Sequence, residues 1–186
     1  MRLEAQDFLR LVENNKTLAI WDTESQGLNG DYGAMLCASI KTFGRKEPVT
    51  FRVEQLGNDK RLVRETRDYL EGFDAWVTYF GKGHDVPLLN TRLLKWGLKP
   101  VDPRPHVDLF FTLKPKLRTS SKSQAHLLRF LGTPEQKMSV SPDTWASLGT
   151  HFYKNMLEIV ARCESDAAGL EALYNRTKHV IRDITR

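Results

Sequence analysis

Four acidic residues of this chain occupy positions at which carboxylates can act together, and they are Asp22, Glu24, Asp85 and Asp166. Asp22 and Glu24 flank Thr23 at the point where the apolar run 18–21 ends. Because residues two apart on a strand point to the same side, both carboxylates can converge on one point. Taken alone, the pair also fits a solvated strand end that is followed by a turn.

Asp85 and Asp166 lie on other predicted elements. Asp85 follows a strand pattern and the turn 81–84, and it begins a helix, where an Asp can also serve simply as a cap that suits the helix dipole. Asp166 lies in the middle of a long C-terminal helix, where Asp is a poor helix former. The alternative for Asp166 is an exposed helical residue paired with Arg162, four positions earlier.

The chemistry that unites these four residues is metal binding. Carboxylates clustered without a cation repel one another, whereas divalent cations reverse that cost. Hard cations such as Mg²⁺ prefer oxygen ligands, and Mn²⁺ suits the same donors. Two such ions about 4 Å apart can activate a water molecule and stabilise the leaving oxygen of a phosphodiester. We therefore expect two ions, Mg²⁺ or Mn²⁺, at these carboxylates.

Hydrophobic periodicity and turn residues predict the elements that would position the site. The strands are expected over 18–21, 35–43, 48–53, 75–80 and 106–110. The helices are expected over 3–13, 58–71, 85–96, 123–130 and 152–176. Three strands with turn-like links precede strands that alternate with helices, and this order predicts an α/β fold in which helices pack on a mixed sheet.

The bulk composition fits a single soluble domain. The chain has 186 residues, of which 40% are hydrophobic and 27% are charged. Its net charge of +5, from 28 Lys and Arg against 23 Asp and Glu, favours an anionic partner but also fits a slightly basic surface. We divide it into an N-terminal helical extension, 1–17, which packs on the domain or mediates assembly, and a main domain, 18–186.

Other classes of protein are disfavoured by what the sequence lacks. Cys37 and Cys163 do not make a disulfide framework, and no His and Cys residues have zinc-ligand spacing. The N-terminus has neither a signal peptide pattern nor an apolar core, and no run approaches the roughly 20 apolar residues of a spanning helix. These features predict a reduced, cytoplasmic protein with no membrane partner.

Three segments resemble a known family in their order and spacing, and they are Ile20–Ser25, Thr78–Leu89 and Arg162–Asp166. They are similar to the three exonuclease motifs of the DEDD 3′–5′ exonucleases in the ribonuclease H-like superfamily. The similarity points to the stand-alone branch with a proofreading-exonuclease-type fold, found in bacteria and phages. The segments 106–109, 116–121 and 127–132 also resemble that branch, so the likeness covers roughly residues 18–176.

The resemblance implies a five-stranded mixed sheet flanked by helices. It implies a two-metal site made of the four carboxylates, and hydrolysis of DNA or RNA at single-stranded 3′ ends. Thr23 and Ser25 would hold the terminal nucleotide. Two alternatives remain open: a catalytically weak or inactive nucleic-acid-binding module of the same fold, and a structure-specific endonuclease.

One position departs from the family pattern. The family usually has a Tyr four residues before the last Asp or a His five residues before it, whereas this chain has Arg162 and Ala161. We expect Arg162 to point into the site and to contact the scissile phosphate or Asp166. Because Arg stays protonated near neutral pH, it cannot replace the usual general base. Three alternatives follow from this departure. The metal ions activate the water by themselves, a residue from elsewhere replaces the general base, or activity is weak or absent.

A basic segment offers a surface for a phosphate backbone. No acid occurs between Asp108 and Glu135, a stretch that contains Arg118 and the hydroxyl of Ser121. Lys82, three residues before Asp85, is close enough to reach a phosphate near the metals. The segment also fits a solvated basic loop.

Several other polar and aromatic residues are expected in supporting roles. Asp108 is expected to support the site indirectly, and His84 and His106 are interpreted as structural hydrogen-bonding residues. Tyr32, Phe43 and Trp145 are candidates for base stacking or for ordinary packing.

Overall fold

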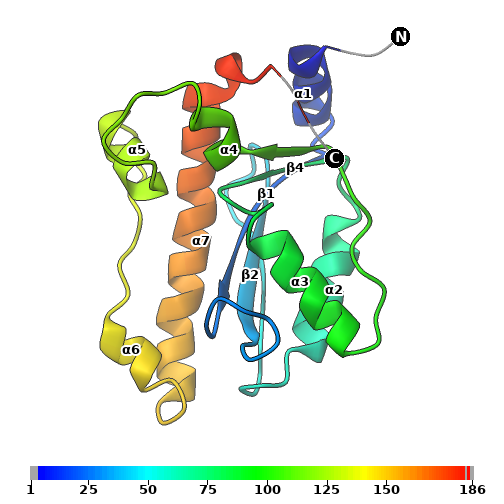
Figure 1. Ribbon diagram of the computed structural model, residues 1–186, viewed down its shortest axis with the longest axis vertical. Helices are drawn as coiled ribbons and strands as arrows, with labels where there is room; N and C mark the ends of the chain where they lie inside the picture. Colours follow the sequence, from blue (N-terminus) through cyan, green and yellow to red (C-terminus); the bar gives the residue numbers. More distant parts are fainter. Residues whose placement is uncertain (1–3, 183, 185–186) are drawn as a thin grey trace.

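The computed structural model describes residues 4–182 and 184 (Figure 1). The strands are β1 Leu18–Ser25, β2 Met35–Thr42, β3 Val49–Arg52, β4 Ala75–Thr78 and β5 His106–Asp108. The helices are α1 Ala5–Asn14, α2 Lys60–Leu70, α3 Asp85–Lys95, α4 Leu109–Leu113, α5 Gln124–Phe130, α6 Pro142–Ala146 and α7 Phe152–Thr177, followed by the 3₁₀ turn Lys178–Val180.

The strands form one mixed sheet in the order β3-β2-β1-β4-β5. β2 pairs antiparallel with both β1 and β3, while β4 pairs parallel with both β1 and β5. β1 is therefore the central strand and runs on past its partner β4, whose pairing with it ends at Ile20. The predicted five-stranded mixed sheet flanked by helices is confirmed.

The core is divided between the two faces of this sheet. On β1, Ala19 and Trp21 belong to the cluster that includes α2 and α3, whereas Leu18 and Ile20 belong to the cluster that includes α1, α4 and α5. The long helix α7 contributes to both clusters, and it crosses the sheet beside β1 and β2 (Figure 1). This two-residue alternation assigns Asp22 and Glu24 to the same face as Ile20.

Two hydrogen bonds fix α7 to the sheet edge on either side of Asp166. Glu164 Oε1 accepts a hydrogen bond from Thr50 Oγ1 at 2.8 Å, and Glu171 Oε1 accepts one from the backbone N–H of Gly44 at 2.6 Å. Glu171 also forms an ion pair with Lys41. Because these anchors lie two residues before and five residues after Asp166, its position against the sheet is fixed.

Several boundaries differ from the prediction. β1 extends through Asp22 to Ser25, because β2 pairs with it along its full length. The predicted strand 106–110 ends at Asp108, whose side chain accepts hydrogen bonds from two N–H groups and caps α4. Helix α6, capped by Ser141 with Pro142 in its first turn, was not predicted. Residue 3, in the predicted first helix, lies outside the described residues.

Helix α1 packs on the C-terminal part of the chain. Leu9 and Val12 are buried in the same cluster as Tyr174 of α7. Glu13 pairs with Lys178 at 2.9 Å and accepts a hydrogen bond from the Tyr174 hydroxyl at 2.7 Å. Among the described residues, no helix combines the length and apolar character needed to cross a membrane.

Candidate metal centre

Three carboxylates meet between β1 and α7. Asp22, Glu24 and Asp166 each present an oxygen atom, and these atoms all lie within 4.8 Å of one another. Asp22 and Glu24 come from alternate positions of β1, and Asp166 comes from the middle of α7. Asp166 is 1% exposed, so its charge is held almost wholly away from water. The spacing therefore brings together three of the four predicted carboxylates.

The fourth carboxylate, Asp85, approaches from the other side of β1. Its Oδ1 accepts a hydrogen bond from Thr23 Oγ1 at 2.5 Å, and Thr23 lies between Asp22 and Glu24. Asp85 begins α3 and is 4% exposed. It is close enough for its charge to raise the pKa of Asp22. Asp85 therefore adjoins the three-carboxylate cluster and is oriented by Thr23.

The electrostatics of the cluster favour a bound cation. Burial, and then the charges of Cys163, Asp85, Asp166 and Glu24, raise the pKa of Asp22 well above its usual value. Burial raises the pKa of Glu24 to about 7, although Arg162 opposes that shift. Burial likewise raises the pKa of Asp85 and of Asp166. Because every shift penalises the ionised form, these carboxylates lack the compensation that a divalent ion supplies.

Two cationic side chains contact the cluster. Arg162 Nε lies 2.7 Å from Glu24 Oε1 and 3.7 Å from Asp166 Oδ2. Lys137 Nζ lies 2.6 Å from the same Asp166 oxygen. The guanidinium of Arg162 also lies 5.8 Å from the ring centroid of Trp145, a stacking contact that restrains its direction. Arg162 thus points into the site, as predicted, and its shorter contact is with Glu24.

The donor set fits divalent metal ions. Oδ1 of the buried Asp166 accepts no hydrogen bond from the described residues, whereas Oδ2 pairs with Lys137 and Arg162. Buried carboxylate oxygens without hydrogen bonds are uncommon and call for a missing partner. An all-oxygen cluster with unsatisfied lone pairs is what Mg²⁺ or Mn²⁺ requires. The residues that would hold the ions are Asp22, Glu24, Asp166 and the adjoining Asp85.

Neighbouring groups hold the backbone of the cluster in place. The Cys163 thiol donates to the carbonyl oxygen of Asp22 at 3.3 Å, and the Gln124 side-chain amide donates to the carbonyl oxygen of Asp166 at 2.9 Å. α5 approaches α7 closely at Gly169, where an added Cβ would lie 3.0 Å from Leu128. These contacts fix the two elements that carry the ligands.

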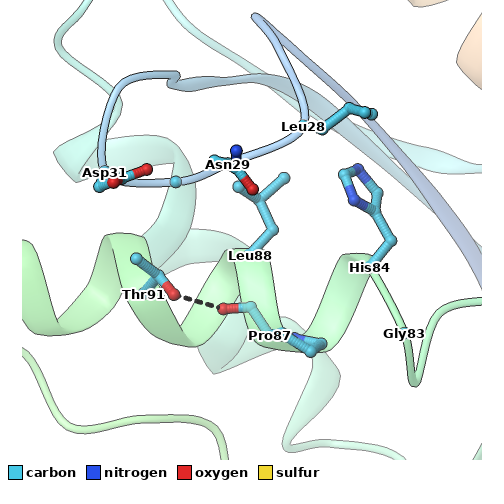
Figure 2. Close-up of a pocket in the computed structure, with 9 residues that line it drawn as sticks. Leu28, Asn29, Asp31, Gly83, His84, Pro87, Leu88 and Thr91 are labelled. Atoms are coloured by element: carbon cyan, nitrogen blue, oxygen red, sulfur yellow. Dashed lines mark hydrogen bonds between the residues drawn. The ribbon is translucent and has the colours of Figure 1, made fainter.

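A cavity of about 320 Å³ opens at the start of α3, where His84 directly precedes Asp85 (Figure 2). One wall is the β1–β2 loop, with Leu28, Asn29 and Asp31, and the other is the start of α3. On the α3 side the cavity is lined by Gly83, His84, Pro87, Leu88 and Thr91. Figure 2 shows the His84 ring directed toward Leu28 across the cavity. The described residues that line it combine apolar side chains with the Asn29 amide, the His84 imidazole, the Thr91 hydroxyl and the Asp31 carboxylate.

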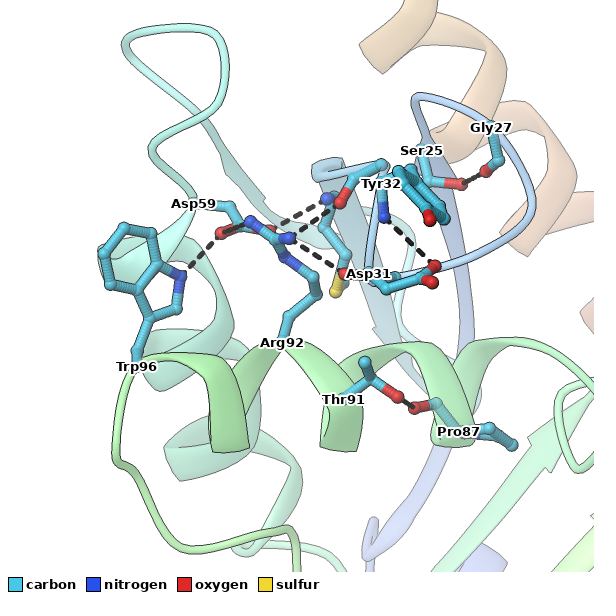
Figure 3. A network of polar contacts seen from close by, with 12 residues as sticks. Ser25, Gly27, Asp31, Tyr32, Asp59, Pro87, Thr91, Arg92 and Trp96 are labelled. Carbon is cyan, nitrogen blue, oxygen red and sulfur yellow. Dashed lines mark hydrogen bonds and ion pairs between the residues drawn. The ribbon is translucent and has the colours of Figure 1, made fainter.

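The loop that forms this cavity is fixed by a buried ion pair (Figure 3). Arg92 of α3 pairs with Asp59 at 2.7 Å and donates to the carbonyl oxygens of Gly30 and Gly33. Asp59 also accepts from the backbone N–H of Met35 and from the indole N–H of Trp96. The wall of the cavity is therefore rigidly tied to α3.

The predicted substrate-binding residues lie in two regions. Ser25 donates to the carbonyl oxygen of Gly27 at 2.8 Å and closes the turn after β1. Lys82 lies three residues before Asp85, and its backbone N–H donates to the Asp108 carboxylate. Arg118 and Ser121 lie on the loop between α4 and α5, and the Tyr79 hydroxyl holds that loop by donating to the carbonyl oxygen of Lys122. Thr23 thus contacts Asp85 directly, and Lys82 lies on the turn that precedes Asp85. Arg118 and Ser121 belong to the loop between α4 and α5.

The supporting residues were interpreted correctly in two instances. Asp108 accepts from the backbone N–H groups of Phe80 and Lys82 as well as capping α4, so it shapes the turn before Asp85. His106 forms a 2.8 Å hydrogen bond with Thr78, and burial lowers its pKa to about 3, so it is neutral. Trp145 packs against the Arg162 guanidinium.

Lys137 is the functional candidate that the sequence reasoning missed. It lies on the segment between α5 and α6, 29 residues before its partner Asp166. That segment has no periodic pattern, and a lone Lys in it resembles many exposed lysines. The one signal was its position just C-terminal to the long acid-free stretch.

Comparisons with known proteins agree with this fold. A sequence model described as RNase_H superfamily matches residues 19–177. The structure is similar to the family B DNA polymerase from the hyperthermophilic archaeon Pyrobaculum calidifontis, with a TM-score of 0.69 and 17% sequence identity. That similarity covers 87% of this chain and 24% of the polymerase chain. The sequence has no match among curated proteins.

Proposed function

The chain belongs to the RNase_H superfamily, and on that premise we propose that it is a metal-dependent 3′–5′ exonuclease of DNA or RNA. The observation that carries the proposal is the meeting of three carboxylates within 4.8 Å, with Oδ1 of the buried Asp166 lacking a hydrogen bond from the described residues. Nucleases of ribonuclease H-like fold use divalent metals. Two bound ions would activate water and stabilise the charge of the phosphate and its leaving oxygen.

The protein's own residues then have distinct tasks. Asp22, Glu24, Asp85 and Asp166 hold the ions, and the Thr23 hydroxyl orients Asp85 through a 2.5 Å hydrogen bond. Arg162, restrained by Trp145, is placed to donate to a phosphate oxygen once its carboxylate partner binds metal.

The cavity beside Asp85 supports action at a strand end. Its volume of about 320 Å³ lies at the lower end of the range for small-molecule sites, which suits a single nucleotide. Leu28 and Leu88 offer apolar contact to a base, and Asn29 and His84 offer hydrogen bonds. A terminal nucleotide held there would place its phosphodiester next to Asp85, and the single-stranded 3′ end is the substrate that we propose.

A second candidate function is supported by the two cations. Lys137 and Arg162 already neutralise part of the cluster, as they would in a nucleic-acid-binding module that has no need of metal. In that case the carboxylates would be structural, and cleavage would be weak or absent.

An end-labelling assay distinguishes these candidates. Single- and double-stranded DNA and RNA, labelled at either the 5′ or the 3′ end, are incubated with Mg²⁺, Mn²⁺ or EDTA. We expect 3′-end trimming with metal and none with EDTA or with Asp22→Ala, while the exposed Asp74→Ala remains active. Internal cuts without trimming would point to an endonuclease, and no metal-dependent cleavage of any substrate would support the binding module.

The cleavage rate of Arg162→Tyr tests the departure from the family pattern. If Arg162 contributes to catalysis here, the Tyr variant is slower than the wild type, because the phosphate contact is lost. A large gain in rate would instead indicate that the natural site is impaired, and would favour the binding module.

A further inference from the structure

An exposed aromatic cluster lies at the turn that leads to Asp85. Phe80 follows β4 and is 41% exposed, and Phe111 of α4 is 46% exposed. Their ring centroids are 5.5 Å apart and the rings are tilted by 33°. Phe110 packs edge-on against both, at 5.1 Å and 5.3 Å. Two large apolar rings thus remain in contact with solvent at the turn that precedes Asp85.

The backbone of Phe80 is strained in a way that keeps its ring in this position. Its φ of 64° lies in the left-handed region, which bulky side chains rarely adopt. Asp108 holds it there by accepting hydrogen bonds from the N–H groups of Phe80 and Lys82 at 3.0 Å and 2.9 Å. Such strain persists only where the surroundings impose it, and it concentrates at functional sites.

The aromatic cluster is continuous with the cavity beside Asp85. The Phe80 ring packs on Gly83, where an added Cβ would lie 2.6 Å from the ring. Gly83 itself lines the cavity. A chain of nucleotides whose end lies in the cavity would therefore pass over the Phe80 ring as it leaves.

The charges around the rings suit a polyanion. Lys114 Nζ lies 5.6 Å from the Phe110 ring centroid, and Lys82 follows Phe80 by two residues. Asp108, the acid that contacts this turn, is occupied with backbone N–H groups. The combination of exposed rings with flanking lysines is that of sites where bases stack and the backbone is held electrostatically.

We propose that Phe80 and Phe111 form a stacking platform for the bases of a single nucleic-acid strand next to its terminal nucleotide. The proposal extends the nuclease function proposed above, and it names the part of the substrate that this surface binds. Stacking on a ring needs no particular base, so the platform would bind single strands without sequence preference.

The test measures strand binding in EDTA, where metal-dependent cleavage cannot occur. A fluorescent single-stranded oligonucleotide, as DNA and as RNA, carries 2-aminopurine next to its 3′-terminal nucleotide. We expect Phe80→Asn and Phe111→Ala each to weaken binding on the order of tenfold by anisotropy, and to abolish the quenching of 2-aminopurine. Phe80→Trp retains both, and Phe130→Ala, which removes an exposed ring of α5, leaves both unchanged.

Protein stability provides the second readout. Asn tolerates the left-handed conformation better than Phe, which offsets the packing lost with the ring, so Phe80→Asn should melt close to the wild-type temperature. A melting temperature that matches the wild type shows that weaker binding does not come from misfolding. Binding and quenching that match the wild type in both variants would overturn the platform, as would a wild type that binds neither oligonucleotide. A wild type that binds and quenches but never cleaves would overturn the nuclease proposal and leave the platform standing.

Discussion

Asp59 and Asp166 are both buried carboxylates, at 0% and 1% exposure, yet their surroundings are opposite. Asp59 accepts two hydrogen bonds from the Arg92 guanidinium, one from the Trp96 indole and one from a backbone N–H. Lys137 and Arg162 contact Oδ2 of Asp166, but its Oδ1 accepts no hydrogen bond from the described residues. The carboxylate is fully satisfied at Asp59, whereas at Asp166 one oxygen has no partner.

This difference separates a structural carboxylate from a ligand. A buried ion pair with complete hydrogen bonding holds the cavity loop to α3, and removing either partner would leave a buried charge. At Asp166 burial raises the pKa of the carboxyl group, and Oδ1 remains available for an external cation. Burial and charge alone therefore do not identify a metal site, whereas hydrogen-bond satisfaction does.

The largest expected effect is on cleavage by Asp166→Asn. Loss of a partner behind a metal ligand costs about 10- to 100-fold, so loss of the ligand itself should cost more than about 100-fold in rate. The unfolding free energy should change by less than about 1 kcal/mol, because burial raises the pKa of Asp166 and its ionised form therefore contributes little to stability. Initial cleavage rates and denaturant unfolding of the wild type and Asp166→Asn measure the rate loss and the change in unfolding free energy. A variant that unfolds easily but cleaves normally would reverse the assignment.

Asp59→Asn should show the reverse pattern. Leaving the Arg92 guanidinium uncompensated in the core should cost about 3–5 kcal/mol of unfolding free energy. Asp68→Asn, which removes an exposed ion pair with Arg67, should cost less than about 1 kcal/mol. Urea titration gives both values. If Asp59→Asn lowered the unfolding free energy no more than Asp68→Asn, the structural role assigned to the Asp59–Arg92 ion pair would be contradicted.

Stability of the metal-free protein should depend on pH through Glu24. Its pKa is about 7 in the folded protein and 4.5 ordinarily, so the folded state binds more protons between these values. Stability is then lost as pH rises through this window, by about 3 kcal/mol. Glu24→Gln should lack this loss. His106, whose pKa is about 3, contributes in the opposite direction, but it is present in both the wild type and the variant, so its contribution cancels in the difference between their unfolding free energies. If the unfolding free energies of the wild type and Glu24→Gln changed in parallel with pH, the raised pKa of Glu24 would be contradicted.

The smallest effect is expected at Lys137. Its ammonium competes for Asp166 Oδ2, so Lys137→Met should bind Mn²⁺ about two- to fivefold more tightly. Lys154→Met, an exposed residue of α7, is the matched control and should bind like the wild type. Weaker binding in Lys137→Met would mean that Lys137 supports the metal centre instead of competing with it.

The parts of the site that local spacing encodes were predictable. Asp22 and Glu24 share a face because of the two-residue period of β1, and Asp85 begins a helix after a glycine-containing turn. The mixed sheet followed from turn-like links between the first three strands and helices between the others, whereas its strand order was not predicted. These features depend on neighbours in the sequence, and they are therefore visible in it.

The remaining features depend on contacts between distant residues. Lys137 meets Asp166 across 29 residues, and Asp59 meets Arg92 across 33. The left-handed conformation of Phe80 is imposed by Asp108, 28 residues later, so the strain has no local signature. The cap that Asp108 provides also ended the predicted strand early and began α4. Contacts between distant residues decided the first three cases, whereas the Asp108 cap is a local hydrogen bond.

Calorimetric titration of the metal-free protein with Mn²⁺ tests most directly whether the carboxylate cluster is a metal centre. We predict saturable binding by the wild type and by the exposed control Asp74→Asn, and its loss or severe weakening in Asp166→Asn. The absence of binding to the wild type, or equal binding by Asp166→Asn, would contradict the assignment of these carboxylates as metal ligands.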